Sequence, residues 1–314
     1  MVALLAALLA WLLLLEVAMR TVLPRLSETQ QRIEADERVA VSLRPRAAPD
    51  ARTVLLIGNS LLEQGIDRDQ LQQSLRPDYA VAYYPVESTT YLDWLYGLRR
   101  LFAEGSAPAV VVLCISGRQL LSNATYGETF AYRLLQARDL PQLMRDSHLD
   151  LMTASAYLFA LKSAWLGERT AFRLGLLQKW LPRADLLAAH VTDVNPLPLI
   201  VNQDTLGRAL GRLQTLQVLA RVHGATFVYL VPPSLNPGDI GAALALRARA
   251  AGIPVVMPYQ PAEMPRIRFA DGLHLNAGGA ADFTARVGPA LRQTLEATGR
   301  ATPAGAPVPA AAAP

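Results

Sequence analysis

Five short apolar runs, separated by stretches with helical spacing, constrain the fold of this chain more than any other feature. Each run is rich in β-favouring residues and lies between turn residues, which is typical of strands that are covered on both faces. Strands that alternate with helices predict a parallel sheet with right-handed crossovers. The predicted strands are Thr53–Ile57, Ala80–Tyr84, Ala109–Ile115, Ala225–Val231 and Ile253–Met257.

The stretches between these runs complete the pattern. Leucines at three- and four-residue spacing predict helices at about 91–102 and 206–223, and further helices are predicted near 239–251 and 277–297. We therefore expect an α/β domain of three α/β/α layers over residues 51–300, with a parallel sheet of about five strands. In such sheets, binding sites gather beyond the carboxyl ends of the strands.

The alternation is interrupted at about residues 121–205. Helical segments are predicted there at Leu140–Met144, Leu149–Trp165 and Thr170–Leu181. We interpret this region as a helical insertion between the third and fourth strands, which could form a lid, a substrate groove or a surface against a membrane. The tail at 301–314 is rich in Ala and Pro, and this composition predicts disorder.

The first 20 residues are almost entirely apolar, and Glu16 is the only charged residue before Arg20. About 18 such residues are just enough to cross a bilayer. The same stretch also falls within the range of a signal-peptide core. No small-x-small cleavage site follows, so we favour a retained anchor helix at 1–20, followed by a polar stalk or exposed helix at 21–50.

The residues leave the orientation of this anchor open. Arg20 and Arg25 follow the span and no basic residue precedes it, so the positive-inside rule places the main domain in the cytoplasm. A large domain that follows a span can, however, be exported despite nearby charges.

Composition argues against several classes of function. Cys114 is the single cysteine, which excludes an intramolecular disulfide and a Cys-rich zinc site, and it lies in a predicted buried strand. The net charge is only +4, without a dense basic run interleaved with aromatics, so nucleic-acid binding is not expected. Since no Gly-rich phosphate loop and no metal-ligand spacing is present, we expect no cofactor and no metal.

Two distant segments supply the side chains of a nucleophilic triad. Ser60 follows Gly58-Asn59 at the end of the first predicted strand, and Asp271-Gly-Leu-His274 lies in a late loop. A hydroxyl needs an imidazole to take its proton, and the imidazole needs a carboxylate to fix its tautomer. The segments therefore predict Ser60 as nucleophile, His274 as general base and Asp271 as its orienter. The alternative for Asp271 is that it only caps the following helix.

This order of motifs resembles the SGNH/GDSL hydrolase superfamily over about residues 50–120 and 222–292. The resemblance implies a flavodoxin-like sheet and gives Ser60, Asp271 and His274 the same three roles. The Gly-Asp-Ser of the family is Gly58-Asn59-Ser60 here. Asn can still hydrogen-bond its own turn, so we expect this difference to be tolerated.

Two further positions depart from the family pattern. Ser88 falls nearest to the oxyanion-hole glycine that the family has after its second strand, and its backbone N–H can still donate. Arg118, next to Gly117, takes the position of the asparagine that the family has after its third strand. The resemblance thus implies Ser88, Gly117 and Arg118 as oxyanion or substrate residues. The alternative for Arg118 is an ion pair with Glu87 or Asp93.

The resemblance implies acyl-ester chemistry through an acyl-enzyme on Ser60. Water as the acceptor makes an esterase or deacetylase, and a sugar hydroxyl makes an O-acyltransferase. Anchored members of the family act on envelope carbohydrate, which implies an acylated carbohydrate of the cell envelope or exopolysaccharide as substrate. It also implies an inner-membrane protein with a periplasmic domain and with envelope-assembly proteins as partners. The alternative, motivated by Ser88 and Arg118, is a non-catalytic envelope scaffold or glycan-binding protein on the same fold.

Overall fold

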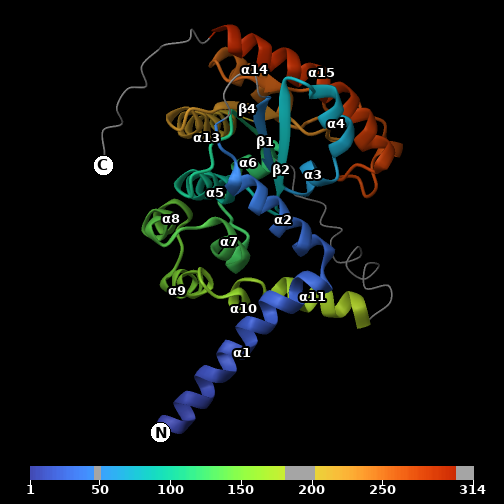
Figure 1. The fold of residues 1–314 in the computed structure, drawn as a ribbon. Coiled ribbons are helices and arrows are strands. Elements are labelled where there is room, and N and C mark those ends of the chain that lie inside the picture. Colours follow the sequence, from blue (N-terminus) through green and yellow to red (C-terminus); the bar gives the residue numbers. More distant parts are fainter. Residues whose placement is uncertain (46–50, 181–201, 302–314) are drawn as a thin grey trace. The chain divides into compact units, whose positions relative to one another are not determined.

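The structure, a computed structural model, describes residues 1–45, 51–180 and 202–301 (Figure 1). The chain divides into two compact units. The first unit contains residues 1–35 and 124–198, and the second contains residues 36–123 and those from 199 onward. The segments 46–50, 181–201 and 302–314 belong to the predicted stalk, insertion and tail, and they lie outside the described residues.

The second unit is built on a five-stranded sheet in the order β2-β1-β3-β4-β5, and every pair of neighbours is parallel. This confirms the predicted α/β fold and its strands. The last strand has only two residues. Pro254 directly precedes it and Pro258 follows one residue beyond its end, and proline cannot donate to a ladder. The strands are β1 (Arg52–Gly58), β2 (Tyr79–Pro85), β3 (Val110–Cys114), β4 (Thr226–Leu230) and β5 (Val255–Val256).

Helices cover both faces of this sheet. Figure 1 shows α4 and α15 on one side of the strands and α5 and α13 on the other, as a three-layer fold requires. The described helices of the unit are α3 (Ser60–Glu63), α4 (Arg68–Leu75), α5 (Tyr91–Ala103), α6 (Gly117–Leu121), α13 (Gln203–Val222), α14 (Gly241–Ala250) and α15 (Ala277–Ala301), with a 3₁₀ turn η2 at Arg266–Arg268.

The core explains why the strands are apolar throughout. Side chains alternate between the two faces of a strand, so Val54 and Leu56 of β1 share one face. They pack in a cluster that includes Phe283 of α15. Leu55 and Ile57 point to the opposite face and are also fully buried.

The first unit is helical. The predicted helix at Leu149–Trp165 is in fact two helices, because Ser163 starts a new one by accepting a hydrogen bond from the N–H of Leu166 at 3.3 Å. The unit contains α1 (Val2–Leu26), the first half of α2 (Glu28–Ser42), α7 (Gly127–Leu134), a 3₁₀ turn η1 (Ala137–Asp139), α8 (Leu140–Ser147), α9 (Leu151–Ala160), α10 (Ala164–Gly167) and α11 (Arg169–Trp180).

The N-terminal helix is long and apolar enough to cross a membrane, and it continues past residue 20 to Leu26. Its second half packs into the first unit, where Met19 and Leu23 are only 2% exposed and contact Ala164. The predicted stalk is also packed rather than solvated, since Ile33 and Ala40 of α2 are buried.

A buried ion pair holds helices of the first unit together. The Arg133 guanidinium contacts the carboxylate of Glu168, and both side chains are almost completely buried. Arg133 also donates to the side-chain oxygen of Gln30 at 2.8 Å. The pair thereby joins α7, the start of α11 and α2 within this unit.

Candidate active site

The turn that presents Ser60 begins at the end of β1. Gly58 lies so close to β3 that a Cβ on it would be 2.3 Å from the carbonyl oxygen of Cys114, so only glycine fits here. Ser60 then opens the short helix α3. Because β1 lies between β2 and β3, this turn is at the point where the strand order reverses, the usual place for a site in such sheets.

The side chain of Asn59 fixes this turn through two hydrogen bonds. Its side chain is fully buried, and its Oδ1 accepts a hydrogen bond from the N–H of Leu61 at 3.0 Å. This confirms that Asn holds its own turn. Its Nδ2 also donates to the carbonyl oxygen of Thr89 at 2.8 Å, which ties the Ser60 turn to the loop after β2.

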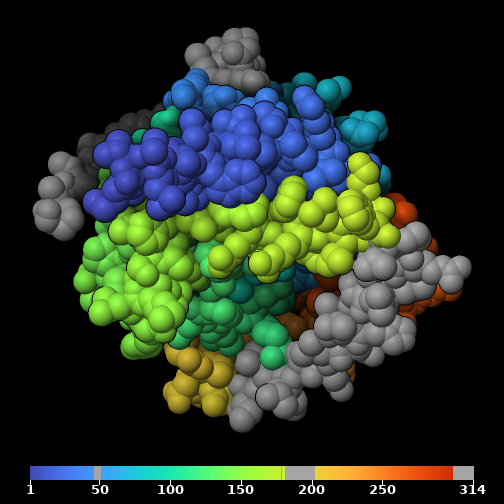
Figure 2. Space-filling model, turned by 90° about the horizontal axis from the view of Figure 1, so that it is seen from below, coloured from blue at the N-terminus to red at the C-terminus, as the bar shows by residue number. Residues whose placement is uncertain are grey.

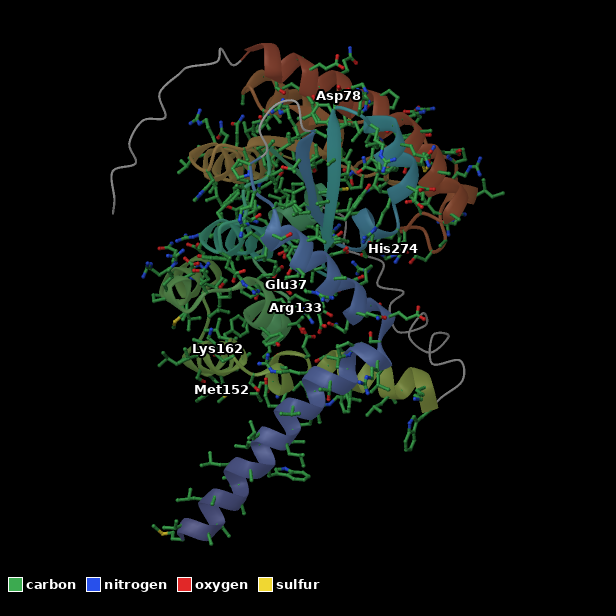
Figure 3. All side chains as sticks on the ribbon, in the orientation of Figure 1. Glu37, Asp78, Arg133, Met152, Lys162 and His274 are labelled. Carbon is green, nitrogen blue, oxygen red and sulfur yellow. The ribbon has the colours of Figure 1, made fainter. Side chains whose placement is uncertain are left out.

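A compact loop before α15 carries the predicted base. The N–H of Ala270 donates to the carbonyl oxygen of His274 at 2.8 Å, and Gly272 between them takes a left-handed φ of 92°. Asn276 accepts from the N–H of Gly279 at 3.0 Å and so caps α15. The loop is thus fixed at both ends and presents His274 (Figure 3).

Ser60, His274 and Asp271 form a continuous chain of hydrogen bonds within the second unit. The Nε2 of His274 lies 2.9 Å from the Oγ of Ser60, and its Nδ1 lies 2.7 Å from the Oδ2 of Asp271. An ionised carboxylate can only accept, so Nδ1 carries the proton in this bond. In the neutral ring, Nε2 is then free to accept the Ser60 hydroxyl proton, which is the tautomer that a general base needs.

Asp271 has two tasks in this arrangement. Its Oδ1 accepts from the N–H groups of Leu273 and His274 at 2.9 and 2.8 Å, and its Oδ2 faces the imidazole. It does not cap the following helix, since Asn276 does so. Partial burial acts to raise the pKa of Asp271, but these hydrogen bonds and the His274 ring outweigh it and lower the pKa to about 2.

The depressed pKa of Asp271 predicts a dependence of stability on pH. A carboxyl with a pKa below its usual 3.8 stabilises the fold above that value and loses this contribution as pH falls towards 2. The difference in unfolding free energy between the wild type and Asp271→Asn should therefore shrink between about pH 4 and pH 2. Urea unfolding over this range measures it, and a difference that grows on acidification would contradict the assignment.

The loop after β2 places Ser88 in a conformation that suits glycine. Ser88 is exposed and has a φ of 61°, in the left-handed region. The loop is held by Thr89, whose hydroxyl donates to the carbonyl oxygen of Val86 at 2.6 Å and accepts from the indole of Trp94 at 2.9 Å. The N–H of Val86 donates to the carbonyl oxygen of Gly58 at 2.9 Å, so the loop adjoins the Ser60 turn.

Replacing Ser88 by glycine tests whether residue 88 has a backbone conformation that suits glycine. A left-handed φ costs a residue with a Cβ about 1–2 kcal/mol, which roughly offsets the extra entropy that glycine loses on folding. Ser88→Gly should thus keep its thermal unfolding midpoint, while Ser88→Val should lower the midpoint. Thermal unfolding of both variants measures the two midpoints. A Ser88→Gly protein less stable than Ser88→Val would contradict the left-handed conformation of residue 88.

Gly117 and Arg118 occupy the first turn of α6, after β3. Gly117 is buried, and a Cβ on it would lie 2.3 Å from the side chain of Ile240, so close packing explains this glycine. Arg118 is exposed. The hydrogen bonds that join Ser60, His274 and Asp271 include neither residue, and their part in the site stays a prediction.

Sequence patterns did not single out Thr89 or Arg266. The contact of Thr89 with Asn59 is made by its backbone carbonyl, which any residue type carries, so this contact leaves no signal in the sequence. The guanidinium of Arg266 lies against Gly272 in the His274 loop, 2.8 Å from where a Cβ would be. Among the described residues, no group of three or more His, Cys, Asp or Glu is placed to hold a metal.

Comparison with known proteins gives only a distant likeness. No family model and no curated protein matches the sequence. The fold is similar to a solved structure described as "Crystal Structure of TesA", with a TM-score of 0.40 and 16% sequence identity over 77% of this chain and 99% of that chain. At this distance the likeness carries no argument about activity.

Proposed function

We propose that this protein is a serine-dependent enzyme of the SGNH/GDSL type that cleaves or transfers acyl esters through Ser60. The observation that carries the proposal is the chain of hydrogen bonds from Ser60 through His274 to Asp271, built from segments 214 residues apart. The buried turn of Asn59 supports it, because it fixes the nucleophile at the carboxyl end of β1.

The first half of the reaction forms an acyl-enzyme. The Oγ of Ser60 attacks the ester carbonyl while Nε2 of His274 takes its proton, and the carbonyl electrons move onto the oxygen. The oxyanion then collapses, the bond to the leaving alcohol breaks, and His274 returns the proton to the leaving oxygen. Asp271 remains ionised and stabilises the imidazolium.

The second half releases the acyl group. His274 removes a proton from the acceptor, whose oxygen attacks the acyl-enzyme, and the proton then returns to Oγ of Ser60. Water as acceptor gives hydrolysis, and a sugar hydroxyl gives an O-acylated carbohydrate. The same three residues serve both outcomes, so we propose an esterase, deacetylase or O-acyltransferase.

We further propose that the substrate is an acylated carbohydrate at the cell envelope, with α1 as a retained inner-membrane anchor and the second unit in the periplasm. The packing of α1 supports retention. Glu16 accepts hydrogen bonds from the N–H groups of Ala164 and Trp165 at 2.8 and 3.2 Å and from the hydroxyl of Ser163 at 3.0 Å. Removal of α1 would strip these partners from α10. A C-terminal alkaline-phosphatase fusion tests the orientation, and its inactivity would place the second unit in the cytoplasm.

A fluorophosphonate probe tests the catalytic proposal directly. The probe reacts with a serine only when a base activates it. The wild type should be labelled, Ser60→Ala should not, and Ser155→Ala should be labelled like the wild type. Ser155 is the matched control because its exposed hydroxyl only bonds the carbonyl oxygen of Met152. Absence of labelling in folded wild type would favour the non-catalytic scaffold instead.

A further inference from the structure

The first unit exposes an unusual amount of apolar surface on α9. The ten residues of this helix include no charged side chain. Ala154 and Tyr157 are buried on one face, yet Leu151, Met152 and Phe159 on the other face are 80%, 81% and 65% exposed. A helix with large apolar side chains on both faces and no charge is normally buried, either in a core or in lipid.

A second helix of the same unit shows the same feature with basic neighbours. Leu174, Leu177 and Trp180 of α11 follow at three-residue spacing, so they lie on one face, and they are 50%, 47% and 79% exposed. Arg173 and Lys179 are exposed beside them. Leucine and tryptophan combined with basic residues are typical of helices that lie at a membrane surface.

Both helices are linked to α1 through the short helix α10. The link lies near Glu16 and Arg20, the first charged residues after the exposed apolar stretch of α1. The short helix α10 contacts α9, α11 and α1. Its N-terminus is bonded to Glu16, and Arg20 donates to the carbonyl oxygen of Lys162 at 3.2 Å. Figure 2 shows α1 beside the helices of residues 151–180 on one face, and Figure 3 labels Met152 on α9 and Lys162 just before α10.

We propose that the exposed apolar residues of α9 and α11 insert into the headgroup–acyl boundary of the leaflet from which α1 emerges. Arg20 is costly to bury in hydrocarbon and follows the apolar stretch, so it marks where α1 leaves the bilayer, with its ion-pair partner Glu16 one turn closer to the lipid. The bonded position of α10 then places α9 and α11 at the depth of the headgroups. Anionic lipid is the preferred surface, because exposed cations accompany the apolar residues of α11. The inference rests on the retained α1 span proposed above, and it stands whether or not Ser60 is a nucleophile.

Site-specific fluorescence in vesicles tests this placement with the full chain. Cys114 is completely buried, and burial raises the pKa of its thiol to about 12, so the native cysteine does not react and introduced cysteines are labelled selectively. The fluorophore NBD is attached to Met152→Cys and Phe159→Cys, and to Leu8→Cys as a reporter of the span. Arg145→Cys on α8 is the exposed polar control from the same unit.

The protein is reconstituted into phosphatidylcholine–phosphatidylglycerol vesicles that contain a nitroxide-labelled lipid. Quenching at residues 152 and 159 should exceed quenching at residue 145 several-fold, with a blue-shifted emission. Quenching at residue 8 together with no excess at 152 and 159 would overturn the proposal. Protection from aqueous iodide without nitroxide quenching would overturn it as well, because a second copy or another protein then covers the face. Lack of quenching at residue 8 would show that the chain does not insert, and the proposal would fail with it.

Discussion

Replacement of Ser60 by alanine should lower the turnover of a short-chain p-nitrophenyl ester by roughly 10³-fold or more, since loss of a triad nucleophile removes most of the rate enhancement. The side chain lies at the start of α3, and the turn itself is held by Asn59, so the fold should be kept. Release of p-nitrophenol measures the rate, and circular dichroism confirms the fold. Unchanged turnover in a folded Ser60→Ala protein would reject the nucleophile assignment.

A double variant makes this test sharper. Residues that act as one unit are strongly non-additive, so Ser60→Ala with His274→Ala should be no slower than either single variant. If Ser60 and His274 contributed independently, the fold losses in rate of the two single variants would instead multiply in the double variant. Ser155→Ala should retain the wild-type rate, which separates the effect of Ser60 from a general effect of losing a hydroxyl.

Replacement of Arg133 by methionine should destabilise the protein by about 3–5 kcal/mol, because it leaves the buried carboxylate of Glu168 without its guanidinium. The matched control is Arg169→Met in the same unit. Arg169 pairs with Glu128, but its side chain is 43% exposed, so this change should cost less than about 1 kcal/mol. Chemical unfolding of the detergent-solubilised full chain, followed by circular dichroism, compares the two.

A compensated variant distinguishes the lost ion pair from lost packing. Arg133→Met combined with Glu168→Leu removes both charges, and such replacements are often neutral or stabilising when packing is kept. We therefore expect the double variant to recover most of the lost stability. A double variant as unstable as Arg133→Met alone would show that lost packing, and not the loss of the guanidinium beside Glu168, causes the destabilisation.

The fold of the second unit could be predicted because each strand is a self-contained apolar run with turn residues at its ends. The helices of the first unit were harder to predict from the sequence. The leucine spacing across residues 149–165 hides the cap at Ser163, which divides the predicted helix in two. The attachment of α1 to α10 was beyond prediction, since Glu16 bonds backbone N–H groups 148 and 149 residues away, and backbone groups leave no pattern in a sequence.

The candidate site also contains residues that could be predicted from the sequence and residues that could not. Ser60, His274 and Asp271 could be proposed because they stand in two short motifs whose order matches a nucleophilic triad, and the structure brings them within hydrogen-bonding distance. The left-handed backbone of Ser88 has no signature in a serine and is visible only by comparison with a family glycine. The part that Arg118 plays remains a prediction.

The amide of Asn59 links two positions, 59 and 88, at which this sequence differs from the SGNH/GDSL pattern that it resembles. A carboxylate at this position could not donate to the carbonyl oxygen of Thr89, and two oxygens would face each other across the 2.8 Å gap. Asn59→Asp should therefore displace the loop that carries Ser88. The conformation of the loop that carries Ser88 thus depends on an amide, and not a carboxylate, at position 59.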